Sequence, residues 1–329
     1  MGIYRFLKNS FIMRNGFNRG IMREYRFVLV FFGALAAAWL YAPGFFTGTN
    51  LLLIANQIIS VAAVSGCVAL VMAAGHFDLS IGAAVAVANM TCALLLYRGC
   101  SIPLAVLGPV AAGLLMGMVN GWFVGVKGLA SFYVTLATQI GYEGLSYIVG
   151  SGGFILRTTA LQPLAHSEFL HLPLYVWILL AVAAVLQFLL NNTLYGRYLL
   201  AAGYRESTAR AAGINVRQII FINYCIVGVV AGIIGVVYTA RVGYGSMTTG
   251  SSYAYDGIVG NLLGGNRISG GKASVLRAMA GAYLWGILQN YMGYVGVPYY
   301  WQRIIKCIII LFAISRDKKV QEKIRQMWN

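Results

Sequence analysis

The chain consists of long apolar runs separated by short polar connections. Ten such runs follow one another, and most of them approach the roughly 20 residues that a helix needs to cross the hydrocarbon core of a bilayer. The pattern predicts an all-α polytopic membrane protein with about ten transmembrane helices. The runs lie at residues 27–42, 50–74, 79–97, 103–126, 129–150, 174–191, 218–240, 253–265, 278–294 and 298–315.

The run over 253–265 is short for a full crossing and is rich in glycine at its end. Gly264-Gly265 closes it, and a second pair, Gly270-Gly271, follows shortly afterwards. Irregular backbone at membrane depth is tolerated only where protein or a water-filled cavity surrounds it. We therefore expect a broken helix or a re-entrant turn in this part of the chain.

Glycines also recur at four-residue spacing inside two of the long runs. Gly113, Gly117 and Gly121 share one run, and Gly228 and Gly232 share another. Small residues at this spacing lie on one face of a helix and allow a second helix to approach closely. We expect these glycines to mark contacts between helices.

Composition is that of a single membrane domain. Of the 329 residues, 60% are hydrophobic and only 10% are charged, which is unlike a soluble globular domain. The net charge of +16 is concentrated at the two ends and in short connections, so we do not expect nucleic acid as a partner. The expected divisions are a basic cytoplasmic or lipid-bound segment over 1–26, a transmembrane domain over 27–315 and a basic cytoplasmic tail over 316–329.

The positions of Lys and Arg predict the orientation in the membrane. They crowd both ends of the chain and the connections 195–219 and 266–277, whereas the alternate connections hold only Arg98, Arg157 and Arg241. Basic connections remain on the cytoplasmic side of a membrane. With ten crossings, this places both termini of a multi-pass protein in the cytoplasm.

The polar loop 193–217 stands between two membrane-length runs. We expect a short helix in it, because the residues after Arg205 are good or tolerable helix formers and Gly213 can adopt the left-handed backbone that ends a helix. A short exposed helix beneath a membrane protein can dock a soluble partner, which indicates a transporter driven by a protein that it does not itself contain. The residues of this predicted docking helix are Arg205, Glu206, Ser207, Thr208, Ala209, Arg210, Ala211, Ala212, Gly213 and Ile214.

No nucleotide-binding, metal-binding or catalytic set is recognisable in the sequence. The run from Gly265 to Ala273 fails as a phosphate loop, because Asn266 stands five positions before Gly271 and Ala273 follows Lys272. The cysteines and histidines show no metal-ligand spacing. We expect no cofactor on this chain and no enzymatic activity of its own.

Asp78 is the first acid after the second run. Its carboxylate can accept the free amides near Ser80 and Ile81 at the start of the next helix, as an N-cap does. It can also take part in gating or in substrate passage, and the two roles are compatible at a hinge.

Glu143 is the one acid that we expect to lie well inside a membrane run. Burying its charge costs at least about 2.5 kcal/mol, so an intramembrane carboxylate is a functional candidate by default. Proton or substrate chemistry, a pair with a base such as Arg157 and a purely structural hydrogen bond all remain open for this residue.

Side-chain amides within the runs suit an uncharged, polyhydroxylated substrate, and they equally suit hydrogen bonds between helices. Each of these polar residues is a weak signal by itself. The candidates for the translocation path or its gate are Asp78, Ser80, Asn120, Glu143, Asp256 and Asn261.

Four groups of residues, in order along the chain, carry a family resemblance. They are Gly75-His-Phe-Asp78-Leu-Ser80-Ile-Gly82; Met118-Val-Asn120-Gly121 with Phe132-Tyr-Val-Thr135-Leu; Asn191-Asn-Thr-Leu-Tyr-Gly196-Arg197 with Thr208-Ala-Arg-Ala-Ala-Gly213-Ile-Asn215; and Tyr255-Asp256 with Leu263-Gly264-Gly265 and Ser269-Gly270-Gly271-Lys272. Together they resemble the permease subunits of bacterial ABC importers for monosaccharides such as ribose, galactose and xylose. The resemblance spans about residues 27–316.

This resemblance implies a permease of the bacterial inner membrane that pairs with a second copy or a paralogue. Two cytoplasmic ABC ATPase subunits would bind ATP and Mg²⁺, and an extracytoplasmic sugar-binding protein would deliver the substrate. The segment 205–214 would be the coupling helix that seats in an ATPase cleft.

Three other functions compete with this interpretation. A proton-coupled secondary transporter would use Glu143 as its proton carrier, but it leaves the arginine-rich docking loop unexplained. A related ABC permease could carry nucleosides or branched-chain amino acids, although a zwitterion requires charged partners at mid-membrane. A membrane enzyme would need a nucleophile and base or a metal cluster.

Overall fold

Helices dominate the computed structural model, which describes residues 43–150, 156–170 and 172–316. The predicted first run 27–42, the basic segment 1–26 and the tail beyond residue 316 lie outside the described residues. The helices are α2 (Gly48–Ala73), α3 (Ile81–Tyr97), α4 (Ile102–Gly121), α5 (Ser131–Val149), α6 (Gln162–His166), α7 (Leu174–Asn192), α8 (Leu194–Tyr204), α9 (Glu206–Ala211), α10 (Val216–Val242), α11 (Tyr253–Leu263), α12 (Val275–Tyr294) and α13 (Tyr299–Arg316).

The predicted all-α membrane architecture is confirmed. Within the described residues, four helical stretches are long and apolar enough to cross a bilayer, and α3 is a shorter apolar helix. The helix count of ten and the side on which the termini lie stay predictions. The four stretches are Gly48–Ala73, Ile102–Val126, Leu174–Asn192 and Val216–Val242, of which the second includes the π-helical turn η2 (Trp122–Val126).

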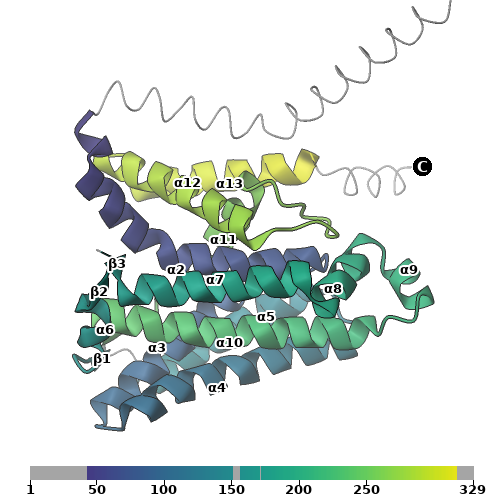
Figure 1. Cartoon of the computed structure of the whole chain (residues 1–329), viewed down its shortest axis with the longest axis horizontal. Coiled ribbons are helices and arrows are strands. Elements are labelled where there is room, and N and C mark those ends of the chain that lie inside the picture. Colours follow the sequence, from purple (N-terminus) through teal and green to yellow (C-terminus); the bar gives the residue numbers. More distant parts are fainter. Residues whose placement is uncertain (1–42, 151–155, 171, 317–329) are drawn as a thin grey trace, which may run out of the picture.

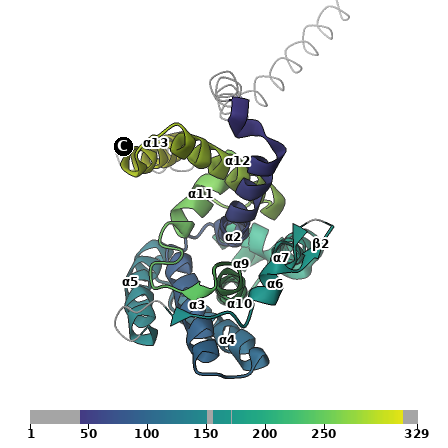
Figure 2. The same ribbon diagram turned by 90° about the vertical axis from the view of Figure 1, so that its left-hand side faces the viewer.

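Two helices form the centre of the bundle. Helix α10 packs against α3, α4 and α2, and α2 packs in turn against α7, α11 and α12 (Figures 1 and 2). Helix α13 lies beyond α11 and α12, on the outer side of this layer. Among the four membrane-length helices of the described chain, these two, from the second and seventh predicted runs, are the most buried.

Short polar side chains fix several helix starts. The Thr193 hydroxyl accepts the Gly196 amide at 3.2 Å and begins α8, and the Asn215 side chain accepts the Gln218 amide at 3.2 Å and begins α10. Both contacts satisfy amides that have no partner within the helix. These caps make the boundaries of the predicted docking loop sharp.

Helices α4 and α10 approach so closely that their backbones touch. A Cβ at Gly113 would overlap the Gly228 carbonyl oxygen, and a Cβ at Gly228 would overlap the Gly113 carbonyl oxygen. A Cβ at Gly117 would meet the backbone of Tyr224, one helical turn further along. The predicted role of these glycines in helix packing is confirmed.

The seventh and eighth predicted runs are joined by an irregular chain that lies along α3. Strand β4 (Tyr244–Gly245) pairs with β1 (Leu156–Arg157), and Asn89 of α3 then holds the continuing chain. The Asn89 side chain donates to the Tyr244 carbonyl at 3.1 Å and accepts the Ser246 amide at 2.8 Å. Helix α11 begins only afterwards, and its 11 residues span about 16 Å, roughly half of a bilayer core. This arrangement agrees with the expected interrupted crossing.

The end of the bundle opposite α9 carries the remaining small elements (Figure 1). There, α6 is followed by a hairpin of β2 (Glu168–Phe169) and β3 (Leu172–Pro173). This is the region of the long connection 151–173.

A buried ion pair joins α11 to α13. The Lys306 ammonium lies 2.5 Å from Asp256 Oδ1, and both side chains are at least nine-tenths buried. The Trp285 indole of α12 donates to the same carboxylate oxygen at 2.8 Å, and the Ser252 hydroxyl donates to Asp256 Oδ2 at 2.6 Å. The sequence had led us to expect Glu143 as the one acid deep inside the bundle. That expectation is wrong, because Asp256 is also deeply buried.

Replacing Lys306 by Met should strongly destabilise the protein, because it leaves the Asp256 carboxylate buried without a counter-charge. We expect a loss of about 3–5 kcal/mol, and recovery of most of it in the double variant Lys306→Met, Asp256→Asn. Thermal unfolding of the purified protein in detergent measures both effects. The control is Arg210→Met, which breaks an ion pair whose side chains are about half exposed and should cost less than about 1 kcal/mol. Equal destabilisation by the single and double Lys306 variants would contradict the role of this pair.

Candidate functional site

The predicted docking helix is present as α9. Its side chains are exposed, except that Ala209 is buried against the rest of the protein. The Arg210 guanidinium pairs with the Glu206 carboxylate one turn earlier, with Nη2 and Oε1 2.5 Å apart. An exposed helix of small residues with one buried anchor is a surface that a partner can reach.

Helix α9 ends as predicted, at a glycine with a left-handed backbone. Gly213 adopts φ = 82°, in the left-handed region, and its amide donates to the Arg210 carbonyl at 3.0 Å. The Ile214 amide donates to the Ala209 carbonyl at 3.1 Å, and the Ile214 side chain packs against the core. Glycine and the apolar residue after it therefore stop the helix and anchor its exit.

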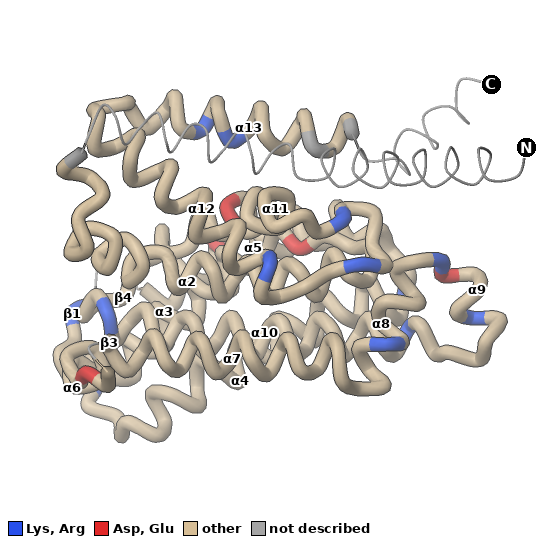
Figure 3. The backbone as a smooth tube through the Cα atoms, turned by 45° about the horizontal axis from the view of Figure 1, so that its top comes forward, with Lys and Arg blue, Asp and Glu red and all other residues tan. Residues whose placement is uncertain are grey.

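Basic residues gather around this end of the molecule. Figure 3 shows Lys and Arg on α8, on α9 and on the neighbouring connection between α11 and α12. Helix α9 itself contributes Arg210, and Arg205 precedes it directly. The surface that surrounds the docking helix is thus positively charged.

Three segments meet through their backbones where α8 ends, immediately before α9. The Gly271 amide donates to the Ala73 carbonyl, at the C-terminus of α2, at 3.0 Å. A Cβ at Gly203 of α8 would overlap that same carbonyl, and a Cβ at Gly270 would lie 2.8 Å from Gly203 O and from the Gly75 backbone. We call this contact of Ala73–Gly75, Gly203 and Gly270–Gly271 the glycine junction. It leaves no side chain between α8, the end of α2 and the α11–α12 connection.

His76 lies beside the glycine junction. Burial lowers the pKa of its imidazole, and the nearby Glu206 carboxylate of α9 partly opposes that shift. The imidazole is therefore neutral at neutral pH. The α2–α3 connection thus lies near the docking helix.

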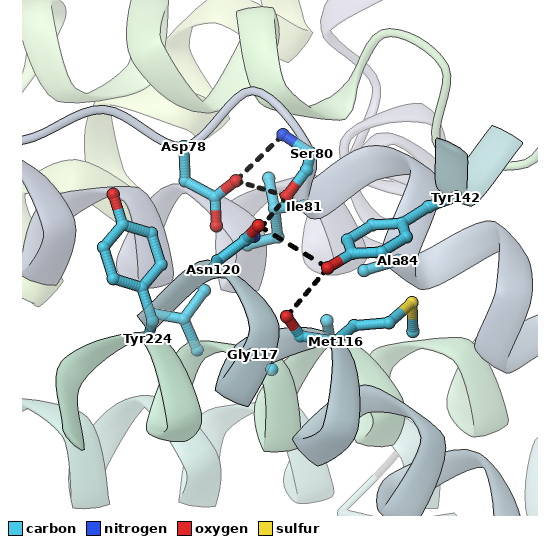
Figure 4. Close-up of a pocket in the computed structure, with 12 residues that line it drawn as sticks. Asp78, Ser80, Ile81, Ala84, Met116, Gly117, Asn120, Tyr142 and Tyr224 are labelled. Carbon is cyan, nitrogen blue, oxygen red and sulfur yellow. Dashed lines mark hydrogen bonds between the residues drawn. The ribbon is translucent and has the colours of Figure 1, made fainter. Parts of the chain in front are cut away.

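Asp78, Ser80 and Asn120 form one hydrogen-bonded network (Figure 4). Asp78 Oδ1 accepts the Ser80 amide at 2.8 Å and the Ser80 hydroxyl at 2.7 Å, and the Asn120 amide donates to that hydroxyl at 2.8 Å. The Tyr142 hydroxyl lies 3.5 Å from Asn120 Oδ1 and donates to the Met116 carbonyl at 2.9 Å. Asp78 thus binds the Ser80 amide as predicted, but the N-cap position of α3 is occupied by Ser80 and not by Asp78.

Little space remains in this network. The cavity among Asp78, Ser80, Asn120, Tyr142 and Tyr224 measures about 10 Å³, which is enough for about one water molecule. These residues consequently lock α3, α4, α5 and α10 together in this conformation. Whether the network opens as a gate stays a prediction.

The α2–α3 connection is tied to two further helices through Phe77. The Phe77 amide donates to the Ser131 hydroxyl at 3.1 Å, at the first residue of α5. The Phe77 carbonyl accepts the Tyr224 hydroxyl of α10 at 2.7 Å. A continuous path of backbone and hydrogen-bond contacts therefore runs from α8 and α9 through residues 73–80 to α5.

Glu143 lies in a different place, on the wall of a second cavity. This cavity measures about 150 Å³ and lies between α3, α5 and the chain just before α11. The Glu143 carboxylate accepts the Gln139 amide at 3.0 Å. Among the described residues no basic group lies within 4.0 Å of it, so the anticipated pair with Arg157 does not occur.

The other two path candidates belong to the packed interior. Asp256 is in the ion pair with Lys306, and Asn261 donates to the Ser65 carbonyl at 2.8 Å and accepts the Asn266 amide at 2.7 Å. The six candidates therefore fall into four separate places, because Asp256 and Asn261 share no partner, and their parts in transport stay predictions. Within the described residues, no group of three His, Cys, Asp or Glu side chains could hold a metal ion.

Sequence reasoning missed most of the second cavity. Gln139, Glu143 and Tyr147 recur at four-residue spacing and line one face of α5, which is a signal that the sequence does contain. Thr248 and Ser251 come from the irregular chain before α11, and no helical spacing could have linked them to α5. Lys306 lies within the last predicted run, and no spacing in the sequence points to its partner Asp256.

Comparison with known proteins independently supports the family resemblance found in the sequence. Residues 49–314 match the family of permease components of the branched-chain amino acid transport system. No solved structure matches the chain.

Individual relatives match over nearly the whole chain. The ribose import permease RbsC of Escherichia coli (strain K12) is 29% identical over 94% of this chain and 98% of its own length. The ribose import permease of Bacillus subtilis (strain 168) is 28% identical over 91% of this chain and 94% of its own length. The L-arabinose transport system permease AraH of Escherichia coli (strain K12) is 28% identical, with 92% of each chain covered. The predicted family resemblance is thereby confirmed, and the chain belongs to this family of ABC transporter permease components.

Proposed function

We propose that this chain is the transmembrane permease subunit of an ATP-driven importer for a monosaccharide or a similar small polyhydroxylated solute. The observation that carries the proposal is α9, a short exposed helix. Beside it, the glycine junction joins α8 to the end of α2 and to the α11–α12 connection through backbone contacts. The ribose and arabinose permeases among the relatives support the substrate class. The chain supplies the path through the membrane and hydrolyses no ATP itself.

The implied partners follow from this division of labour. Two cytoplasmic ATPase subunits bind ATP and Mg²⁺ and dock on the segment 205–214. A second permease copy or a paralogue completes the membrane part, and an extracytoplasmic binding protein delivers the solute to the end that carries α6, β2 and β3. Lipid surrounds the rest of the membrane domain.

The proposed topology has ten crossings in a bacterial inner membrane with both termini in the cytoplasm. The positive-inside rule supports it, because α9 and the α11–α12 connection share one basic end of the molecule. Arg157 and Arg241 lie at the opposite end, beside the paired strands β1 and β4.

The mechanism is a change of access driven from α9. ATP binding and release in the partner move α9, and the glycine junction passes this movement directly to the end of α2 and to the α11–α12 connection. Residues 75–80 then carry it to α5 and α10 through the contacts of Phe77. Packed interfaces of this kind shift between discrete arrangements rather than deform gradually.

A permease for branched-chain amino acids is less consistent with the second cavity. An amino acid would bring an α-carboxylate, which requires a cationic partner once it is desolvated. The residues that line this cavity include Glu143 and no Lys, Arg or His. An uncharged solute therefore fits its chemistry better.

Arg210→Glu should weaken binding of the ATPase by about tenfold, because it reverses the charge in the last turn of the docking helix. Co-purification of the ATPase with the permease from membranes measures the effect. The control is Arg98→Glu, at the far end of α3, which should leave co-purification unchanged.

The double variant Glu206→Arg, Arg210→Glu separates docking from helix stability, because it keeps the ion pair within α9 while exchanging its ends. We expect it to lose the ATPase as the single variant does. If the exchange restores binding, the single variant acted by fraying α9, and the docking role of Arg210 is wrong.

Tyr224→Phe should uncouple transport from ATP hydrolysis, because it removes the hydroxyl that ties Phe77 to α10. Loss of one buried hydrogen bond predicts about two- to tenfold less solute imported per ATP hydrolysed, with hydrolysis itself retained. Uptake and hydrolysis are measured together in proteoliposomes that contain the complete importer. Tyr283→Phe is the matched control, since its hydroxyl also donates to a backbone carbonyl, that of Ala55 at 3.3 Å, away from the 75–80 connection. An unchanged ratio for Tyr224→Phe would rule out this path.

A further inference from the structure

The second cavity has an unsatisfied polar atom on its wall. Gln139 Oε1 is buried without a hydrogen-bond partner among the described residues, while its amide nitrogen is engaged by Glu143. The Glu143 carboxylate has acceptor capacity beyond this one bond. Buried polar atoms of this kind are costly unless a ligand or water satisfies them.

The three walls of the cavity differ in chemistry. Helix α5 contributes the polar stripe of Gln139, Glu143 and Tyr147, and the chain before α11 contributes the hydroxyls of Thr248 and Ser251. Helix α3 contributes mainly small residues, namely Gly82, Ala83 and Ala86, which leave room opposite the polar stripe. Tyr147 is about half exposed, so one edge of the site is open to its surroundings.

The position of the cavity is fixed by a backbone contact. Gly82, at the start of α3, lies against Gly250, and a Cβ at Gly250 would stand 2.6 Å from the Gly82 carbonyl oxygen. This contact brings the N-terminal ends of α3 and α11 to the same cavity wall. Helix N-termini carry partial positive charge, which disfavours a cation at this wall.

The volume of about 150 Å³ is more than ten times what one water molecule requires. A site of this size with acceptors, donors and one aromatic ring matches a small solute rich in hydroxyl groups, because each hydroxyl both donates and accepts. The adjoining cavity at Asp78 holds about one water, so it cannot serve the same purpose in this conformation.

We propose that the cavity between α3, α5 and the chain before α11 is a transit site for one sugar molecule. This inference rests on the proposed function. Glu143 and Gln139 Oε1 accept hydrogen bonds from sugar hydroxyls, and Thr248 and Ser251 bind from the opposite side. The Tyr147 ring lies against the apolar face of the sugar. The site binds weakly, because a solute in transit must leave as readily as it enters.

The first test measures uptake of D-ribose and L-arabinose in proteoliposomes that hold the complete importer. Gln139→Leu and Glu143→Leu should each lower the rate about three- to tenfold, while ATP hydrolysis stimulated by the binding protein continues. Glu143→Gln keeps the hydrogen-bonding capacity and should recover part of the uptake lost in Glu143→Leu. Thr138→Val, the residue next to Gln139 but outside the cavity, is the matched control.

The second test reads occupancy directly. In Thr248→Cys, D-ribose at high concentration should slow alkylation of position 248, as followed by mass spectrometry of that peptide. Adding Gln139→Leu should abolish the protection. This readout does not depend on ATP hydrolysis, and a purely structural role for Gln139 would not affect it.

The possible outcomes show whether the transit site or the proposed function is wrong. Absence of ATP-driven uptake of any monosaccharide by the unmodified importer would overturn the proposed function itself. Normal uptake by both leucine variants, with that importer active, would overturn only the transit site. Complete loss in Glu143→Gln would indicate a proton carrier instead, and protection of position 248 by Na⁺ without sugar would indicate a cation site. Either result overturns the sugar assignment.

Discussion

Direct contact between helix backbones is the constraint on which this structure depends. Inside a bilayer the lipid tails are as apolar as leucine, so the hydrophobic effect does not pull helices together. Close van der Waals packing must supply the attraction, and glycine permits the closest packing. The α4–α10 crossing at Gly113 and Gly228 is the clearest example, and Gly281 of α12 meets the backbone of Gly260 in α11 in the same way. Substituting a larger residue at such a crossing moves a whole helix, because no flexible side chain can give way.

The same constraint connects the segment before α9 directly to the membrane domain. At the glycine junction, Gly203 of α8 touches the Ala73 carbonyl, and Gly271 donates to that carbonyl. A displacement of α8 therefore cannot be absorbed by rotamer changes before it reaches α2. Hydrogen bonds of Phe77 extend this contact to α5, which carries the polar wall of the second cavity. The docking helix and the proposed transit site are linked by few and mostly rigid steps.

Polar groups at membrane depth divide into those that are satisfied and those that are not. Asn89 uses both ends of its side chain to hold the irregular chain before α11, and Asp256 is matched by Lys306, Trp285 and Ser252. These groups stabilise the fold. Gln139 and Glu143 retain unused capacity beside open space, which is the physical distinction between a structural network and a binding site.

The sequence by itself determined the class of protein, the docking helix and the glycine contacts. Each of these rests on local or periodic information: apolar runs of membrane length, an αL stop at Gly213, and small residues at four-residue spacing. The family membership also followed from motifs whose order along the chain is visible in the sequence. Tertiary structure alone decided which polar residues face one another. Asp256 pairs with Lys306, which lies 50 positions later in the chain, whereas Asp78 and Glu143 lie in different places. These positions depend on how each helix is rotated about its axis and on the course of the irregular chain over residues 243–252. Neither the rotation of a helix nor the course of an irregular segment produces a periodic pattern of residues that the sequence could reveal.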